Sequence, residues 1–194
     1  SLDHPNIVPI HTVGTSDGSA GKRAVHYFVM KLIQGTTLSM AIRRKLLDLC
    51  SAVSVVTQVC DALDAIHGAG FVHRDVKSPN IMLEPSGRAT LLDFGVLRDV
   101  GGGATIGTRA GTILGTPHYV SPEQARGSPA IDRRSDIYSL GVVTYEALTG
   151  RLPLLAGTIA EILMKQIGEP PSPPENLNPA IPREVSLVVL RALA

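Results

Sequence analysis

One short loop of this sequence carries the kinds of side chain that transfer of a phosphoryl group requires. Asp75, Lys77 and Asn80 all lie in HRDVKSPN at residues 73–80. The reaction needs a base for the attacking hydroxyl, a cation for the migrating phosphoryl group, and oxygen ligands for magnesium. Asp93, which follows a short apolar stretch, adds a hard carboxylate oxygen of the kind that suits magnesium. These residues therefore supply a candidate base, a candidate cation and candidate metal ligands.

Four motifs follow one another along the chain, and the first two of them contain these residues. They are HRDVKSPN at 73–80, LLDFG at 91–95, GTPHYVSPE at 115–123 and SDIYSLG at 135–141. In motif order and spacing, the chain resembles the eukaryotic-like (Hanks-type) protein kinase family over nearly its whole length, and its later motifs are most similar to bacterial members. The resemblance implies an α+β, protein kinase-like fold, with a mainly helical C-terminal lobe and the last strands of the N-terminal lobe.

The resemblance assigns a role to each of the reactive residues. It makes Asp75 the catalytic base and Lys77 the group that neutralises the γ-phosphoryl. Asn80 and Asp93 become the ligands of Mg²⁺ or Mn²⁺. Thr116 matches the position that contacts the base and the lysine in the serine/threonine branch. The resemblance therefore implies a non-specific serine/threonine protein kinase that uses ATP and phosphorylates protein substrates.

The nucleotide pocket implied by the resemblance is only partly contained in this chain. Met30 matches the gatekeeper position, and the main chain of Lys31 and Ile33 would pair with the edge of adenine. Met82 would form the floor of the pocket. The family usually has an acidic residue where Lys31 stands, but a backbone contact tolerates that change. From the residue types alone, the same positions predict only an apolar strand that packs in a core.

Further residues match positions that hold the fold of the family together. Asp136 would brace the backbone around His73 and Arg74, although the helix dipole alone also favours an acidic residue in a first turn. Glu123 and Arg191 match a buried ion pair, in which the loss of one partner typically costs about 3–5 kcal/mol. Both features are expected to be structural rather than catalytic.

Control by phosphorylation is a further expectation from the resemblance. Related kinases often need a phosphate on the activation segment, here residues 93–123, and Arg74 is the residue that would receive it. Thr105, Thr108 and Thr112 are the candidate acceptors, with Thr108 or Thr112 expected as an autophosphorylation site. Autophosphorylation between two copies would involve a homodimer.

The expected elements form a small piece of sheet followed by a helical body. Strands are predicted at 7–14 and 25–33, and helices near 37–45, at 51–68, at 135–149, near 157–168 and from about 183 onward. The predicted apolar stripe of the helix at 51–68 consists of Val55, Val59, Ala62 and Ile66. That of the helix at 135–149 consists of Ile137, Leu140, Thr144 and Leu148.

The resemblance also predicts two regions and a missing part. Residues 1–33 are expected to be a remnant of the small lobe with the hinge, and residues 34–194 the large lobe, cut at its C-terminal end. The Gly-rich phosphate loop, the lysine that pairs with the α- and β-phosphates and its partner glutamate should precede residue 1. The first hypothesis is a kinase fragment that is inactive alone, since positioning of the triphosphate is most of the catalysis. The alternative is a pseudokinase or scaffold module without a small lobe.

Composition argues against several other classes of function. A net charge of +1, the absence of Trp and an aromatic content of 4% predict no nucleic acid partner. No uninterrupted apolar run reaches the roughly 18 residues that span a bilayer. The two cysteines, Cys50 and Cys60, are expected as reduced thiols in or near a helical core. The kinase domain is therefore expected in the cytoplasm, and a membrane anchor would belong to parts of a parent protein outside this chain.

Overall fold

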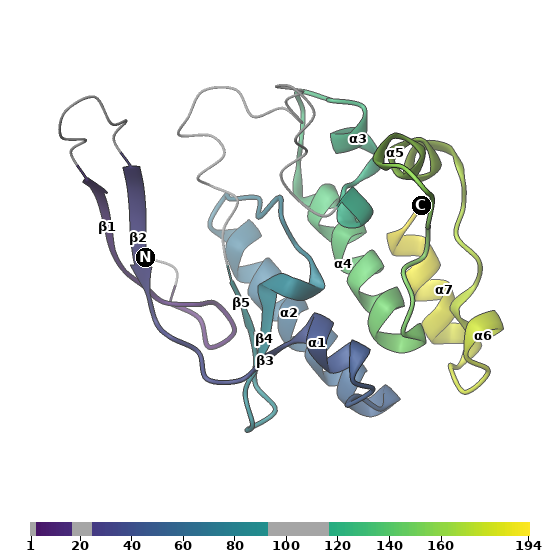
Figure 1. Cartoon of the computed structure of the whole chain (residues 1–194), viewed down its shortest axis with the longest axis horizontal. Coiled ribbons are helices and arrows are strands. Elements are labelled where there is room, and N and C mark those ends of the chain that lie inside the picture. The colour runs from purple at the N-terminus through teal and green to yellow at the C-terminus, as the bar shows by residue number, and fades with distance from the viewer. Residues whose placement is uncertain (1–2, 17–24, 93–116) are drawn as a thin grey trace.

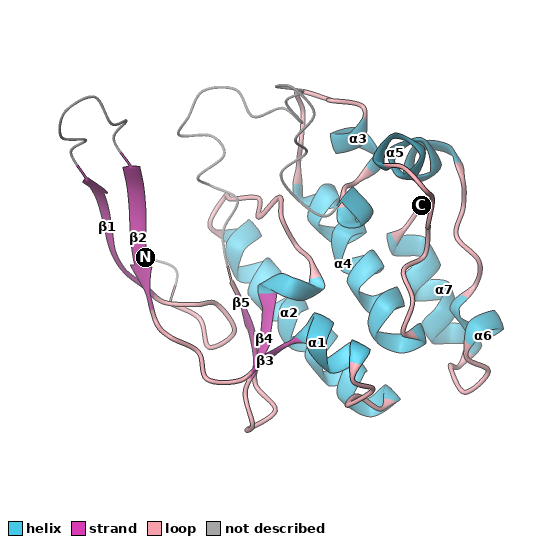
Figure 2. Cartoon of the chain, in the orientation of Figure 1, coloured by secondary structure: helices cyan, strands magenta, loops and turns pink. Residues whose placement is uncertain are grey.

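The computed structural model describes residues 3–16, 25–92 and 117–194 (Figures 1 and 2). Its strands are β1 (Ile10–Ser16), β2 (Val25–Met30), β3 (Thr36–Thr37), β4 (Ile81–Leu83) and β5 (Ala89–Leu91). Its α-helices are α1 (Leu38–Arg43), α2 (Leu49–Gly68), α3 (Pro122–Ala125), α4 (Arg133–Thr149), α5 (Ile159–Gly168), α6 (Pro174–Leu177) and α7 (Arg183–Ala192). Among the described residues, the short 3₁₀ helices are η1 (Ser78–Asn80) and η3 (Pro117–Tyr119). The described residues thus combine a mainly helical body with two small sheets, as the sequence predicted.

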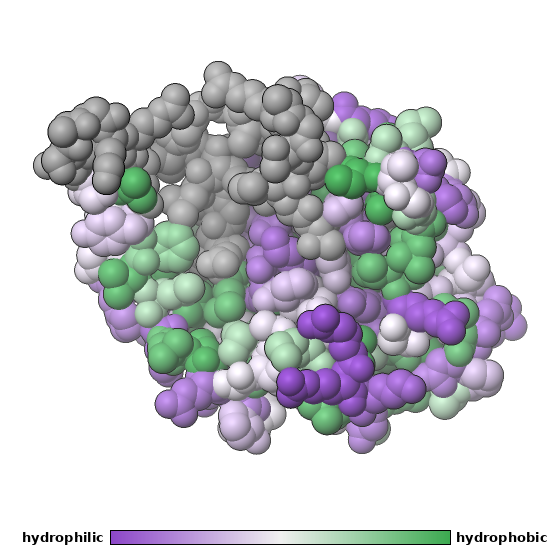
Figure 3. Space-filling model, in the orientation of Figure 1, coloured by the Kyte–Doolittle hydropathy of each residue, from purple (hydrophilic) through white to green (hydrophobic). Residues whose placement is uncertain are grey.

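β1 and β2 form an antiparallel pair that stands at one side of the helical body (Figure 1). Their register begins with Ile10 opposite Met30. The first strand starts later than predicted, because Ile7 forms a bridge with Leu91 instead. Most side chains of β1 are exposed, and hydrophobic residues are visible over this pair of strands in Figure 3. The pair therefore adds little to the core of the described residues.

A second sheet, with the strand order β3–β4–β5, packs against α2. The residues before β1 bond to its strand β5. Val8 N–H donates to the Leu91 carbonyl at 3.0 Å, and Leu91 N–H donates to the Asn6 carbonyl at 2.8 Å. The Asn6 side chain also donates to the Ala89 carbonyl at 2.7 Å. These contacts fix the residues before β1 along the edge of β5.

α2 follows the predicted pattern closely. Its N-cap is Asp48, whose Oδ1 accepts a hydrogen bond from the Ser51 N–H at 2.7 Å. The predicted stripe is confirmed: Val55, Val59, Ala62 and Ile66 are all buried. This side of the helix packs against α4 and β5. Cys50 and Cys60 are free but exposed, so their predicted position in or near the core was wrong.

By length and composition alone, α2 is also apolar enough to cross a membrane, and it is the one such helix among the described residues. It has 20 residues and a mean hydropathy of 1.5. Core helices pass the same test, and the apolar stripe of α2 already packs against α4 and β5. The helix is therefore weak evidence for a membrane span.

α4 departs from the predicted one-sided stripe. Ile137 is 43% exposed and Thr144 is half-buried, whereas Leu140 and Leu148 are buried as expected. Residues outside the stripe are buried as well, and they include Tyr138, Val142, Val143 and Tyr145. The reason is that α4 contacts α2, α7 and η3 on different sides (Figure 1). A helix enclosed in this way has no single apolar face for periodicity to reveal.

Candidate active site

The loop after α2 brings the predicted base, cation and metal ligand together. Asp75 Oδ2 accepts hydrogen bonds from Lys77 Nζ at 2.8 Å and from Asn80 Nδ2 at 3.0 Å. Asn80 Nδ2 also donates to the Asp75 carbonyl at 3.0 Å, because η1 turns the chain back at this point. The side chains of Asp75 and Lys77 are 20% and 16% exposed. The carboxylate and the ammonium are therefore held by the loop and still accessible to a substrate.

Asn80 has its side-chain oxygen left for a metal ion. Its amide nitrogen faces Asp75, so Oδ1 is the atom that can act as a ligand. In the part of the chain that the structure describes, no group of three or more His, Cys, Asp or Glu residues could hold a metal ion. Magnesium is usually bound by one or two protein carboxylates together with phosphate oxygens and water. The amide oxygen of Asn80 therefore fits magnesium as one protein ligand among phosphate oxygens and water.

The backbone just before Asp93 is fixed to the catalytic loop, residues 73–80. Leu92 N–H donates to the Asn80 carbonyl at 2.8 Å, and His73 Nε2 lies 3.1 Å from the Leu92 carbonyl. Because His73 Nδ1 accepts the Asp75 N–H at 3.3 Å, the ring proton of the neutral imidazole lies on Nε2 and is donated to Leu92. The fully buried His73 thus ties the two segments that carry the predicted metal ligands.

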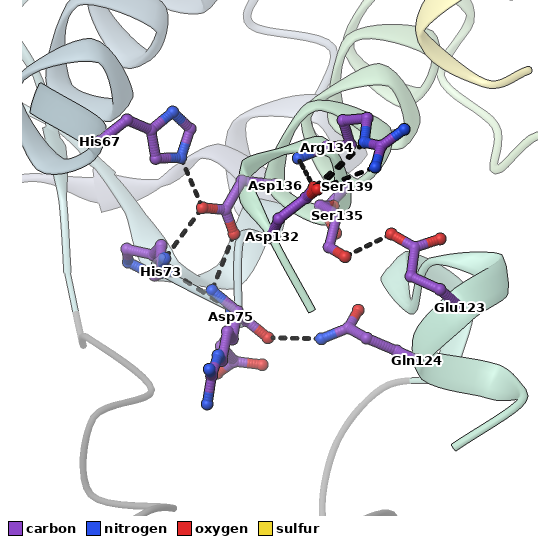
Figure 4. A network of polar contacts seen from close by, with 11 residues as sticks. His67, His73, Asp75, Glu123, Gln124, Asp132, Arg134, Ser135, Asp136 and Ser139 are labelled. Atoms are coloured by element: carbon purple, nitrogen blue, oxygen red, sulfur yellow. Dashed lines mark hydrogen bonds and ion pairs between the residues drawn. The ribbon is translucent and has the colours of Figure 1, made fainter. Parts of the chain in front are cut away.

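Asp136, in the first turn of α4, is fully buried beneath the catalytic loop (Figure 4). Its Oδ2 accepts the His73 N–H at 2.8 Å, and its Oδ1 accepts the Arg74 N–H at 2.7 Å. These are the two backbone contacts that the resemblance implied for Asp136. His67 Nε2, at the end of α2, is a further partner at 2.8 Å from Oδ2, which the sequence analysis did not assign.

Arg74 has a left-handed backbone conformation, with φ of 65°. This conformation disfavours a non-glycine residue by roughly 1–2 kcal/mol. Asp136 accepts the Arg74 N–H, and Gln124 Nε2 donates to the Arg74 carbonyl at 3.2 Å. Hydrogen bonds on both sides of Arg74 therefore hold the conformation from which the chain continues into Asp75.

Gln124 is a site residue that the sequence analysis missed. It forms a capping box with Ser121 at the start of α3, in which the Ser121 N–H donates to Gln124 Oε1 at 3.0 Å. The amide nitrogen of Gln124 is left to contact the Arg74 carbonyl. The spacing Ser-x-x-Gln is a signature of a helix N-terminus, so this signal was present in the sequence.

The predicted buried ion pair between Glu123 and Arg191 is wrong, since these two described residues do not pair. α7 buries Ser186 and Val189, which leaves Arg191 exposed on the other side of the helix. Glu123 is half-buried and accepts a hydrogen bond from Ser135 Oγ (Figure 4). Whether Arg191 is buried depends on the side on which α7 packs. Residue spacing near the chain end did not reveal that side.

The residues predicted for the adenine edge lie where the chain leaves β2. Met30 ends β2, and the Lys31 N–H donates to the Pro9 carbonyl at 3.0 Å. Met30 and Lys31 are exposed, and Ile33 is half-buried. With its N–H used in this way, Lys31 has its carbonyl left for a ligand.

Gly35 sets the distance between this segment and β4. A Cβ at Gly35 would lie 2.1 Å from the carbonyl oxygen of Leu83, which no side chain can tolerate without a shift of the backbone. Just beyond it, Thr37 pairs with Met82, the half-buried residue predicted as the pocket floor. A close backbone approach therefore links the segment predicted to bind adenine to the strand that carries Met82.

Five predicted site residues lie outside the described residues. They are Asp93, Thr105, Thr108, Thr112 and Thr116. The second metal ligand, the phosphorylation sites and the serine/threonine determinant therefore stay predictions.

Comparison with known proteins gives a match over almost the whole chain. The family model described as protein kinase domain matches residues 1–187. The serine/threonine-protein kinase PknB of Mycobacterium leprae is 36% identical over 195 residues, which cover 100% of this chain and 31% of that protein. The serine/threonine-protein kinase PknA of Mycobacterium tuberculosis is 38% identical over 192 residues, 98% of this chain and 44% of that protein. The chain spans less than half the length of these relatives.

Proposed function

The chain belongs to the protein kinase domain family, and from this premise we propose that it contains the catalytic region of an enzyme that transfers the γ-phosphoryl group of ATP to serine and threonine residues of proteins. The proposal is carried by one observation: the Asp75 carboxylate lies 2.8 Å from Lys77 Nζ and 3.0 Å from Asn80 Nδ2. Relatives that are 36% and 38% identical carry the name serine/threonine-protein kinase, which supports the choice of acceptor.

In the proposed reaction, Asp75 accepts the proton of the attacking hydroxyl. As the hydroxyl oxygen bonds to the γ-phosphorus, the bond to the β-phosphate oxygen breaks and ADP leaves. The Asp75 side chain is 20% exposed, so a hydroxyl can approach the carboxylate from solvent. Base catalysis by a positioned carboxylate typically contributes about 10²–10⁴-fold in rate.

Lys77 and Asn80 would serve the phosphoryl side of the site. An ammonium has three N–H donors, and Lys77 uses one of them on Asp75, so it can also contact the transferring phosphoryl group. Asn80 Oδ1 and Asp93 would hold magnesium, which supplies positive charge against the phosphate oxygens. Thr116 would contact Asp75 and Lys77.

Adenine would lie against the segment that leaves β2. In this proposal it pairs with the Lys31 carbonyl and the Ile33 N–H, while Met30 stands at the gatekeeper position and Met82 forms the floor of the pocket. The support is that the Lys31 N–H is already used on Pro9 and that Gly35 brings the segment close to β4.

The regulatory and cellular predictions belong to the same proposal. Phosphate on Thr105, Thr108 or Thr112 would bind Arg74, and autophosphorylation would proceed in a homodimer. Mass spectrometry of the active protein that found no phosphate between residues 105 and 112 would exclude this regulation. A division into a small-lobe region at 1–33 and a large lobe at 34–194, and a cytoplasmic location of the kinase domain, complete the proposal.

The substitution Asp75→Asn in the full-length natural protein tests the proposed function. It should lower kcat for a serine/threonine peptide at least about 100-fold, because the base is lost. Asp64→Asn is the matched control, since Asp64 is an exposed carboxylate on α2 and should leave kcat unchanged. A pseudokinase or scaffold predicts only background transfer in the unaltered protein and in both variants, and that result would reject the proposal.

A further inference from the structure

A chain of three polar side chains connects the catalytic loop to α4 at a second place. Ser78 Oγ lies 2.9 Å from Tyr119 Oη, and Tyr119 Oη donates to Glu146 Oε2 at 2.7 Å. Ser78 is fully buried, and Tyr119 is 6% exposed. Ser78 directly follows Lys77 and begins η1. The chemistry proposed above uses none of these three side chains.

The direction of the hydrogen bonds follows from the number of protons. A phenol has one proton, and Tyr119 donates it to the Glu146 carboxylate. The Ser78 hydroxyl is therefore the donor in its contact with Tyr119. Burial and the nearby Glu146 carboxylate raise the pKa of the Tyr119 phenol, which keeps it protonated at neutral pH. The hydrogen bonds thus run from the Ser78 hydroxyl through the Tyr119 hydroxyl to the Glu146 carboxylate.

Tyr119, the acceptor for Ser78, is held firmly at its backbone as well as at its ring. Ser139 Oγ donates to the Tyr119 carbonyl at 2.7 Å. Ser139 and Glu146 both belong to α4, so one helix holds Tyr119 at two points. In addition, Gln166 of α5 donates to the Pro117 carbonyl at 2.9 Å within η3. A side chain that bonds to Tyr119 is therefore connected through it to α4.

α4 consequently contacts the catalytic loop at two separate points. Asp136 and Glu146 stand 10 residues apart on the helix (146 − 136 = 10), which corresponds to about 15 Å along its axis. At the first point, Asp136 binds backbone N–H groups that precede the proposed base. At the second point, Glu146 binds Ser78 through Tyr119, after Lys77. In the sequence of the loop, the proposed base Asp75 and the cation Lys77 lie between these two anchored parts.

We infer that Ser78 is a positioning residue, whose hydroxyl fixes the Lys77 end of the catalytic loop against α4. Lys77 Nζ lies 2.8 Å from Asp75, so a displacement of the backbone at Ser78 moves the ammonium relative to the base. A misplacement of about 1 Å can cost roughly 100-fold in rate. The consequence for phosphoryl transfer rests on the proposed function, whereas the hold on the loop does not.

Ser78→Ala in the full-length natural protein tests the inference. We expect kcat to fall about tenfold or more and the KM for ATP to change less than about twofold, because positioning and not nucleotide binding is altered. Ser186→Ala is the matched control, since Ser186 is also fully buried and its hydroxyl bonds to the Glu175 carboxylate between α6 and α7. The control should leave kcat per folded molecule unchanged. A kcat of Ser78→Ala equal to that of the control would overturn the inference.

Tyr119→Phe examines the link itself. It removes the hydroxyl that accepts from Ser78, so the double variant with Ser78→Ala should lose no more kcat than Tyr119→Phe alone. Single effects that multiply in full in the double variant would mean that the two side chains act separately, which would contradict the inference.

Hydrogen–deuterium exchange separates this inference from the proposed function. Exchange of the amides at residues 74–83 should be about tenfold faster in Ser78→Ala than in Ser186→Ala, whether or not the protein transfers phosphate. If the unaltered protein shows no transfer but this difference is present, the proposed function fails and the hold of Ser78 on the loop stands. Equal exchange in the two variants would overturn the inference.

Discussion

Replacing Asp136 by Asn should release one end of the catalytic loop from α4. The carboxylate accepts on both oxygens: Oδ1 binds the Arg74 N–H, and Oδ2 binds the His73 N–H and His67. An asparagine has a single side-chain oxygen, so one of these positions becomes an NH₂ group that cannot accept. The smaller loss of stability occurs when the NH₂ group of the asparagine faces Arg74, because only the Arg74 N–H then lacks its acceptor.

The size of this loss can be worked out from the contacts. A hydrogen bond to a charged group contributes about 1.5–3 kcal/mol, and a buried donor without a partner costs about 1–3 kcal/mol. Because these contributions overlap, we expect Asp136→Asn to lower the free energy of unfolding by about 2–4 kcal/mol. The left-handed conformation of Arg74 would lose one of its two supports at the same time.

Asp132→Asn is the control for this substitution. Asp132 is the N-cap of the same helix, it is exposed, and its Oδ1 accepts the Arg134 N–H at 2.8 Å. Asparagine caps about as well as aspartate, so the change in stability should stay within about 0.5 kcal/mol. Urea unfolding followed by circular dichroism gives both values, and hydrogen exchange over residues 71–80 reports the loop. If Asp136→Asn matched its control in both measurements, Asp136 would not be the brace of the loop.

Three further predictions concern stability. Gly35→Ala should cost about 1–3 kcal/mol in urea unfolding because a Cβ would meet the Leu83 carbonyl at 2.1 Å; Gly168→Ala, which enters open space, is the control, and equal stability would contradict the close approach. Burial raises the pKa of Tyr138 from 10.0 to about 12, so the folded protein disfavours the phenolate. The contribution of this pKa shift to the free energy of unfolding, about 3 kcal/mol, is fully present below pH 10 and is lost as the pH rises from about 10 to 12. Between about pH 9 and 11.5, the free energy of unfolding of Tyr138→Phe should therefore decline less than that of the unaltered protein. Arg191→Ala should change the free energy of unfolding by less than about 0.5 kcal/mol, since Arg191 is exposed, and a loss near 3 kcal/mol would restore the buried pair.

The features that could be predicted from the sequence depend on residues of one continuous segment. Asp75, Lys77 and Asn80 meet because they share a loop, and the side-chain types alone define their chemistry. The stripe of α2 was predictable because one side of that helix packs on the protein while other sides stay exposed. The capping box that places Gln124 is equally local, and the sequence already contained its signal.

The remaining contacts join segments that are distant in the sequence. The partner of His67 is Asp136, and the partner of Ser78 is Tyr119, and neither pair has a spacing that periodicity could reveal. The exposure of Ile137 also depends on which elements surround α4 rather than on its own pattern. Three-dimensional packing of α2, α4 and η3 around the catalytic loop decides all of these contacts.

The chemical identity of the product tests the central claim most directly. The full-length protein is incubated with ATP labelled at the γ-phosphate, magnesium and a protein acceptor, and the phosphoamino acids are separated after hydrolysis. The proposed site predicts labelled phosphoserine or phosphothreonine, and none when the protein carries Asp75→Asn. Label that appears only on tyrosine, or equal label on serine and threonine with Asp75→Asn, would contradict the assignment of Asp75, Lys77 and Asn80 as the phosphoryl-transfer site.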